Sequence, residues 1–114
     1  MKRPLAYLTA AWSGQPEIDM ELAAGYCRLA YKAGFSPICP LIYLPLFLDD
    51  GVPEEHKAGI DMARDMLRRS HTLIVCWETV DEDVKNDIAV AGRLGIAATT
   101  LEGVLAVKGH GRNA

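Results

Sequence analysis

Asp87 has the sequence setting of a catalytic carboxylate. It stands about one turn into a helix expected over residues 82–94, and that helix follows the apolar segment Thr72–Trp77. In a doubly wound α/β domain, the start of such a helix lies at the lip of the ligand crevice. A carboxylate placed there can act as a nucleophile or hold a sugar hydroxyl. The alternative is an acid that pairs with the helix dipole or with Lys85.

The loop after the first apolar segment offers further polar groups to the same crevice. Ser13 and Gly14 present a hydroxyl and backbone N–H groups at the start of the first expected helix, where a ribose or phosphate can bind. A plain turn explains both residues equally well. Tyr7 is either an orienting group for the Asp87 carboxylate or a strand tyrosine that lies half in the core.

Aromatic and acidic residues flank the expected crevice. Trp12 and Trp77 end the strands that border it, so each ring either stacks on a base or packs against the protein. Thr9 begins the loop at the crevice. Asp81 and Asp83, in the acidic loop before the helix, are placed to hold a sugar hydroxyl or protonate a leaving base, or they are solvated acids.

Composition limits the class of protein. The 114 residues, 50% apolar and 24% charged, indicate one globular domain over residues 1–107, followed by a flexible, Gly-rich tail over 108–114. The net charge of −3 gives no basic face for a nucleic-acid backbone, so we expect no nucleic-acid partner. No segment reaches the ~18 apolar residues of a membrane span, which predicts a cytoplasmic protein without a membrane partner.

The cysteines indicate neither disulfides nor a metal site. Cys27, Cys39 and Cys76 are an odd number without a C-x-x-C pair, and the last two lie in apolar runs. The simplest interpretation is buried free thiols in a reducing cytosol. No residue cluster has metal-site spacing, and neither a P-loop nor a G-x-G-x-x-G sequence is present. The sequence therefore implies no metal and no redox cofactor.

Apolar segments alternate with amphipathic ones along the chain. Three helices are expected: one over residues 16–33, a second that begins within 50–55, and a third over 82–94. The apolar face of the first helix, expected to pack inward, consists of Ile18, Leu22, Gly25, Tyr26, Leu29 and Ala33. Strands are expected over residues 4–10, 35–39, 72–77 and 96–101, with a short fifth over 104–107 as an alternative. The long apolar connection over 41–51 favours a loop with a short helical turn, which serves as a lid or contact surface.

Right-handed β-α-β connections between these elements define the architecture. The expected fold is a flavodoxin-like α/β three-layer sandwich. Its parallel sheet has four to five strands in the order 2-1-3-4-5, with helices on both faces. The strand order reverses between strands 1 and 3, so the crevice lies above residues 9–14 and 77–87.

The crevice residues also carry a family resemblance. Tyr7–Gly14, which reads Y-L-T-A-A-W-S-G, resembles the opening Y-[LI]-A-G-P-x-[ST]-G of the nucleoside 2-deoxyribosyltransferase superfamily. Asp87–Ile96 is similar to its helix start E-L-G-Y-A-x-x-x-G-K-P. The chain is closer to a branch of small bacterial and phage domains, whose segments recur here in order and spacing at Gly25–Arg28, Phe47–Asp50, Pro53–Gly59 and Ser70–Val75. The resemblance extends from Leu5 to Thr99.

The resemblance implies roles for three residues. In the superfamily the helix-start acid is the glycosyl nucleophile, the first-strand tyrosine lies near it, and an acid on the second helix engages the base or sugar. These positions correspond to Asp87, Tyr7 and Asp61. For Asp61, a surface ion pair with Arg64 or Arg69 is the alternative.

Several positions depart from the superfamily pattern at the mouth of the crevice. Asp87 stands in place of Glu and is one methylene shorter, and a nucleophile must come within about 3–3.5 Å of the anomeric carbon. The small residue before the acid is replaced by the sequence Val84-Lys85-Asn86. Four further replacements are His56 for Arg, His71 for Asp, Ala11 for Pro and Leu41 for His. Together these changes favour altered or lost chemistry.

The sequence thus leads to two classes of hypothesis. In the first, the protein binds a nucleoside or nucleotide and cleaves or transfers the N-glycosidic bond through Asp87, with Tyr7 orienting it and substrate contacts from Thr9, Trp12, Ser13, Gly14, Asp61, Trp77 and Asp81. In the second, it is a non-catalytic nucleotide-binding module or an assembly module of the same fold. The apolar segment Leu41–Leu48 would then form the surface of a homo-oligomer, most simply a dimer.

Overall fold

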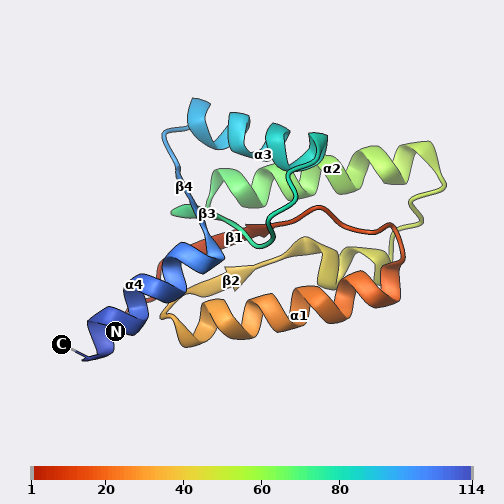
Figure 1. Ribbon diagram of the computed structural model, residues 1–114. Coiled ribbons are helices and arrows are strands. Elements are labelled where there is room, and N and C mark those ends of the chain that lie inside the picture. Colours follow the sequence, from red (N-terminus) through yellow and green to blue (C-terminus); the bar gives the residue numbers. More distant parts are fainter. Residues whose placement is uncertain (1, 114) are drawn as a thin grey trace.

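The computed structural model describes residues 2–113 and has four parallel strands between two layers of helices (Figure 1). In chain order the elements are β1 (Leu5–Thr9), α1 (Pro16–Lys32), β2 (Ser36–Ile38), the short 3₁₀ turns η1 (Pro40–Ile42) and η2 (Leu44–Leu46), α2 (Pro53–Arg68), β3 (Thr72–Val75), α3 (Glu82–Arg93), β4 (Ala97–Thr100) and α4 (Leu101–Asn113). The sheet order is β2-β1-β3-β4. The predicted α/β three-layer fold and the order of its first four strands are confirmed.

Strands β1 and β3 form the centre of the sheet because they carry apolar side chains on both faces. Leu8 and Ile74 pack into one layer, whereas Tyr7 and Leu73 pack into the other. Thr9 is the last residue of β1, and it pairs in register with Val75. A hydroxyl is thereby placed at the carboxyl edge of a buried strand.

The helices cover the two faces of the sheet in pairs, α1 with α4 and α2 with α3 (Figure 1). On the first face, the buried apolar residues of the helices are Ala23, Ala30 and Leu101. On the second face, Leu67 of α2 and Ala91 of α3 pack against the sheet. On this second face, α2 and the start of α3 lie at the edge of the sheet where β1 ends.

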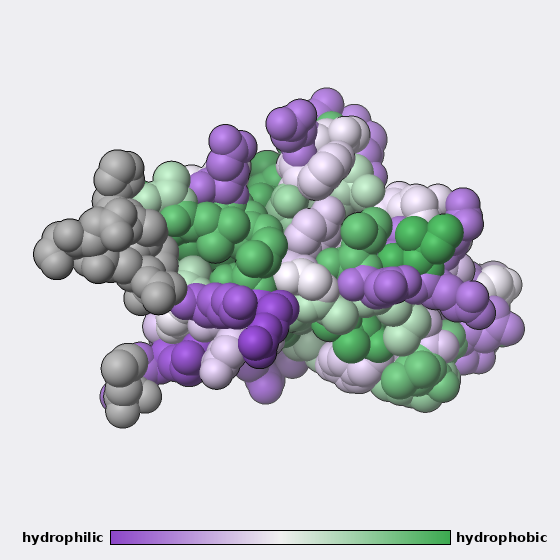
Figure 2. Space-filling model, turned by 60° about the horizontal axis from the view of Figure 1, so that its bottom comes forward, coloured by the Kyte–Doolittle hydropathy of each residue, from purple (hydrophilic) through white to green (hydrophobic). Residues whose placement is uncertain are grey.

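The buried face of α1 differs from the predicted stripe. Ile18, Leu22 and Leu29 are 48%, 46% and 38% exposed, while the buried side chains of this helix are Asp19, Ala23 and Ala30. Alanines let the helix lie close to a sheet whose own large side chains already fill the layer. The prediction that these three large residues face inward was wrong. Figure 2 turns the α1 side of the molecule forward and shows hydrophobic side chains in separate patches among hydrophilic ones.

The alternative of a fifth strand over residues 104–107 was also wrong, because this segment lies within α4. A short apolar run does not by itself distinguish a strand from a buried helix. Val104 and Leu105 pack from α4 against the α1 side of the core. The helical backbone continues to Asn113, and the division at residue 107 into a domain and a flexible tail stays a prediction.

The connection between β2 and α2 contains η1 and η2, in agreement with the predicted loop and short helical turn. Its apolar side chains are not all covered: Leu46 is 74% and Phe47 is 57% exposed. The three cysteines are free; Cys39 and Cys76 are buried and Cys27 is half-buried. Within the described residues, no helix combines the length and apolarity needed to cross a membrane.

Candidate functional site

A cleft of about 790 Å³ opens at the carboxyl end of β1. Its floor consists of residues 7–10, and its walls come from the start of α1, from the connection that contains η1 and η2, from the first half of α2 and from Asp83 and Asp87 of α3. Open parallel sheets bind ligands at this edge, beside the strand where the order reverses. The cleft is large enough for a small organic molecule of nucleoside size.

The Asp87 carboxylate lies in this cleft and is held in place by β1. Thr9 donates a hydrogen bond of 2.6 Å from its Oγ1 to Asp87 Oδ2. In the described part of the chain, no hydrogen bond reaches the other oxygen, Oδ1, and no buried side-chain oxygen is left without a partner. One carboxylate oxygen is therefore oriented by the protein and the second is open to the cleft.

The surroundings of Asp87 act on its protonation in opposite directions. Burial raises the pKa of the Asp87 carboxyl, and the net shift is upward. The Thr9 hydrogen bond and the positive charge of Arg64 on α2 lower this pKa, whereas the negative charges of Asp83 and Asp81 raise it further. A carboxyl group that lies in a cleft and whose pKa is shifted by burial and by nearby charges is typical of functional sites.

Tyr7 is buried beneath the cleft, with 7% of its surface exposed, and it lines the floor beside Thr9. Burial and then the negative charge of Asp87 raise the pKa of its hydroxyl, while Arg64 lowers it. The hydroxyl is consequently a neutral donor at physiological pH. In residues 2–113 the hydrogen bond that orients Asp87 comes from Thr9 and none joins Tyr7 to it, so the orienting role of Tyr7 stays a prediction.

The loop before α1 is built around Asp19. Its Oδ1 accepts hydrogen bonds from the backbone N–H of Ser13 at 2.9 Å and from the Ser13 hydroxyl at 2.7 Å, and its Oδ2 accepts one from the Gly14 N–H at 2.9 Å. Gly14 has a positive φ of 86°, a conformation that glycine adopts readily. Asp19 is 2% exposed. The donors expected to bind ribose or phosphate are therefore already bonded to a side chain of the protein.

The other predicted contact residues divide into two groups. Trp12 lines the cleft and packs its ring against Tyr26, with centroids 6.1 Å apart. Trp77, by contrast, is 60% exposed and is not among the cleft-lining residues. Asp61 also lies outside the cleft, and its carboxylate pairs with Lys57 at 2.9 Å. Asp81 caps α3 by accepting a hydrogen bond of 2.9 Å from the backbone N–H of Val84.

Acidic side chains dominate the polar lining of the cleft: Asp19, Asp49, Asp50, Glu55, Asp83 and Asp87. Among the described residues, no lysine or arginine lines it, and His56 is the lining residue that can become cationic. His56 Nδ1 lies 2.7 Å from Asp50 Oδ1. The described residues contain no group of three or more His, Cys, Asp or Glu side chains arranged to hold a metal ion.

Sequence reasoning missed two charged residues that act on this site. Asp19 was not singled out, although an acid in the first turn of a helix is favoured by the helix dipole and can accept hydrogen bonds from the loop before it. Arg64 was considered only as a surface ion-pair partner of Asp61. Its neighbours Arg68 and Arg69 pair with Asp65, at 3.5 and 3.3 Å, but Arg64 is half-buried and its charge lowers the pKa of Asp87.

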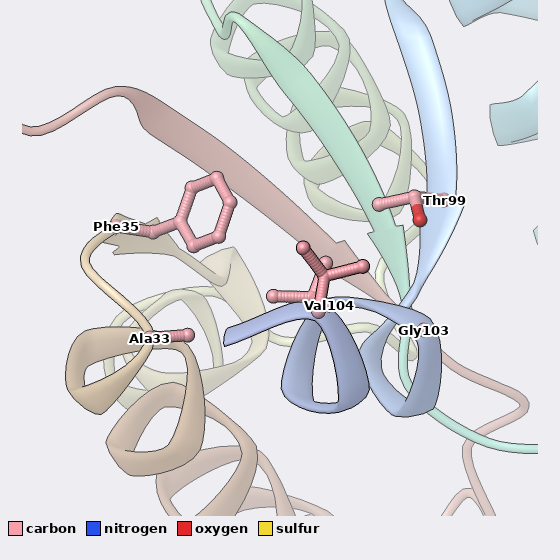
Figure 3. Close-up of a pocket in the computed structure, with 6 residues that line it drawn as sticks. Ala33, Phe35, Thr99, Gly103 and Val104 are labelled. Carbon is pink, nitrogen blue, oxygen red and sulfur yellow. The ribbon is translucent and has the colours of Figure 1, made fainter. Parts of the chain in front are cut away.

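A second, smaller cavity of about 270 Å³ lies away from these residues, between the end of α1, β4 and α4. Phe35 and Val104 point into it in Figure 3, with Ala33, Thr99 and Gly103 around them. It is lined by apolar side chains and one hydroxyl. Because it offers no titratable group, the acidic cleft is the candidate site.

Comparisons with known proteins agree with the fold. The structure is similar to that of a 2-deoxyribosyltransferase from the psychrotolerant bacterium Bacillus psychrosaccharolyticus, described as a biocatalyst for the synthesis of antiviral and antitumoral nucleosides. The TM-score is 0.69 at 9% sequence identity, over 84% of this chain and 70% of the other. At this identity the similarity shows the fold alone, and it supports the resemblance at that level.

Sequence comparisons place the chain in a family. No curated protein sequence matches it significantly. A family model described as "Domain of unknown function (DUF7768)" matches residues 4–101, which include the whole sheet and every element that lines the cleft. The protein therefore belongs to the family described as Domain of unknown function (DUF7768).

Proposed function

We propose that this protein binds a nucleoside or a nucleoside 5′-monophosphate in the cleft and cleaves or transfers its N-glycosidic bond through Asp87. The observation that carries the proposal is the Asp87 carboxylate, which has one oxygen held by Thr9 and the other open to the cleft. The similarity in fold to a 2-deoxyribosyltransferase supports the class of ligand.

The reaction needs one nucleophile and one acceptor. Asp87 Oδ1 attacks the anomeric carbon C1′, the C1′–N bond breaks, and the base leaves with the bonding pair and takes a proton from water in the cleft. The sugar is then held as an ester on Asp87. Attack of water on C1′ breaks the ester and releases the free sugar, and attack of a second base gives a new nucleoside. In each case the proton lost by the attacking group neutralises the hydroxide left by the first step, and the carboxylate is restored with overall retention.

The surrounding residues favour this chemistry. Thr9 and Arg64 stabilise the ionised carboxylate, which is the nucleophilic form, against the effect of burial. Trp12 lines the cleft and offers a ring face to a base. The buried Tyr7 hydroxyl remains a neutral donor for a sugar oxygen or for Asp87 in the complex. The shorter reach of Asp relative to Glu is compensated if the sugar lies deep on the cleft floor.

The test is a base-release assay. Wild type, Asp87→Asn and Asp65→Asn would be incubated with ribo- and deoxyribonucleosides and their 5′-monophosphates, with and without a second free base, and the products separated by chromatography. We expect release or exchange of the base by wild type and none by Asp87→Asn. Asp65→Asn, which removes a half-exposed acid paired with two arginines outside the cleft, should behave as wild type.

Three outcomes contradict the proposal. If Asp87→Asn releases base at the wild-type rate, Asp87 is not the nucleophile. If wild type releases no base but nucleosides raise its melting temperature, the protein binds its ligand without cleaving it. The absence of both effects removes the nucleoside function altogether.

The exposed segment around η2 favours a second candidate function, self-association. Leu46 and Phe47 are largely exposed, and Tyr43 next to them is 39% exposed, so an apolar surface borders the cleft. A homodimer through this surface would close one wall of the site. Light scattering of wild type and of a Leu46→Asp/Phe47→Asp double variant tests it: a wild-type dimer that the variant converts to a monomer supports the assembly, and a monomeric wild type excludes it.

A further inference from the structure

The loop over residues 13–15 has the shape of an anion-binding site that the protein fills itself. Consecutive backbone N–H groups at the start of a helix are the usual receptor for a phosphate. Here the N–H groups of Ser13 and Gly14 and the Ser13 hydroxyl all donate to the two oxygens of Asp19. The carboxylate thus occupies the position that two oxygens of a bound phosphate would take.

Asp19 is firmly bound in this position. It is 2% exposed yet borders the cleft next to Gly14 and Pro16. Burial by itself would raise the pKa of its carboxyl, but the hydrogen bonds from Ser13, Gly14 and Gln15 outweigh burial and lower the pKa. The Asp19 carboxylate is therefore ionised at neutral pH. An incoming phosphate would have to displace this carboxylate from the hydrogen bonds that it already accepts.

The rest of the cleft offers no replacement site for a phosphate. Its polar lining contains five further carboxylates, and no lysine or arginine of the described chain lines it. His56, the lining side chain that can become cationic, already has Asp50 as a partner at 2.7 Å. Arg64 acts on Asp87 and Tyr7 but is not among the lining residues. A second negative charge in this space is repelled on several sides.

We infer that Asp19 is a specificity-determining residue that closes the phosphate site of the cleft, so that the ligand is an unphosphorylated, neutral or cationic nucleoside. The inference rests on the proposed function and narrows its class of ligand. It assigns Ser13 and Gly14 to the binding of Asp19 in place of the ribose or phosphate contact expected from sequence. The like charges of the cleft disfavour an anionic ligand, so 5′-monophosphates should bind at least about tenfold more weakly than the matching nucleosides.

The test combines a ligand series with an anion rescue. In the first arm, binding of nucleosides and their 5′-monophosphates to the wild-type protein is measured by calorimetry and by base release at constant ionic strength. In the second arm, the melting temperatures of wild type, Asp19→Ala, Asp19→Asn and Glu17→Ala are followed against inorganic phosphate, with chloride at equal ionic strength as the reference. Glu17→Ala is the control because it removes an exposed acid from the same turn of α1.

We expect nucleosides to bind wild type at least about tenfold more tightly than their monophosphates, and phosphate to restore stability to Asp19→Ala but not to wild type or Glu17→Ala. If Asp19→Ala does not fold, Asp19→Asn retains the shape of the side chain without its charge and should lose part of the discrimination against monophosphates. Equal or tighter binding of monophosphates to wild type overturns the inference and leaves the proposed function intact.

The two proposals fail separately. If no nucleoside or monophosphate binds wild type, the proposed function fails, and the rescue alone decides the role of the loop. Rescue of an Asp19 variant by phosphate then still supports a phosphate site closed by Asp19. Stabilisation of wild type by phosphate to the same extent, or no rescue of either variant, overturns it.

Discussion

Thr9 and Asp87 are joined by a hydrogen bond of 2.6 Å although 78 residues separate them in the chain. The bond links the last residue of the central strand β1 to the second turn of α3, on the face of the sheet that α2 and α3 cover. It leaves one oxygen of the carboxylate open to the cleft. The protonation state and the orientation of the Asp87 carboxylate, the proposed nucleophile on α3, therefore depend on Thr9 of β1.

Replacement of Thr9 by valine keeps the shape of the side chain and removes the donor. Because that hydrogen bond lowers the pKa of Asp87, its loss should raise this pKa and move the acidic limb of the kcat/KM profile to higher pH. Thr9→Ser retains the hydroxyl and should keep the wild-type profile. A carboxyl titration by NMR checks the shift without relying on activity, and an unchanged titration of Asp87 in Thr9→Val would contradict the assigned role.

Removal of the Arg64 charge should act in the same direction. Arg64→Gln withdraws a positive charge that favours the ionised form of Asp87, so the pKa of Asp87 should rise and base release at acidic pH should fall. Arg68→Gln is the matched control, since that exposed side chain pairs with Asp65. Identical pH profiles for both variants would show that the two arginines are equivalent and that Arg64 has no special role.

Asp87 should reduce the stability of the protein at neutral pH. Its folded-state pKa lies above the ordinary value of 3.8, so the folded protein binds the proton more tightly than the unfolded chain. Below pH 3.8 both states are protonated and the effect is absent; as the pH rises through the folded pKa, stability is lost. Asp87→Asn should therefore melt at a higher temperature than wild type at pH 7 and at the same temperature well below pH 3.8. A lower melting temperature for the variant at pH 7 would refute this.

Asp19 should have the opposite effect. Its folded-state pKa lies below the ordinary 3.8 because its hydrogen bonds outweigh burial, so its contribution is fully present above pH 3.8 and is lost as the pH falls through the folded pKa. Asp19→Asn should lower the free energy of unfolding at pH 7 by about 1.5–3 kcal/mol, the range for a hydrogen bond to a charged group. Denaturant unfolding from pH 7 to pH 2 tests whether the difference from wild type shrinks in acid.

Two glycines should respond to alanine in opposite ways. A Cβ at Gly14 meets no atom within 4 Å, but the φ of 86° is unfavourable for alanine, so Gly14→Ala should cost about 1–2 kcal/mol through backbone strain alone. Gly25 lies within α1 without a positive φ and also has open space around a Cβ. Gly25→Ala should stabilise the helix by about 0.5–1 kcal/mol. Equal effects at both positions would contradict this assignment.

The parts of the fold that depend on local pattern were predictable from sequence. Apart from Thr9 and Thr72, the segments at β1 and β3 are apolar, which is typical of strands buried on both faces, and the handedness of β-α-β connections limits the possible strand orders. Position and sheet topology together bring Thr9 and Asp87 to one edge. The hydrogen bond between them depends on packing of α3 against β1, which no local pattern contains.

The errors come from residues whose burial is decided by their neighbours. Periodicity selects the large apolar side chains Ile18, Leu22 and Leu29 as the inner face of α1, but the narrow space beneath the helix admits Ala23 and Ala30. A buried acid such as Asp19 contradicts the usual rule that acids are exposed. The groups that donate hydrogen bonds to Asp19 belong to Ser13 and Gly14, and only the three-dimensional structure of that loop shows that they point toward this carboxylate.

The alanines beneath α1 have a consequence for the opposite end of that helix. Because the small side chains of Ala23 and Ala30 let α1 lie close to the sheet, they also affect how near the loop held by Asp19, at the start of that helix, lies to the cleft. The width of the cleft therefore depends in part on the volume of the side chains at positions 23 and 30, which do not line the cleft. We expect larger residues at these two positions to widen the cleft without any change in the residues that line it.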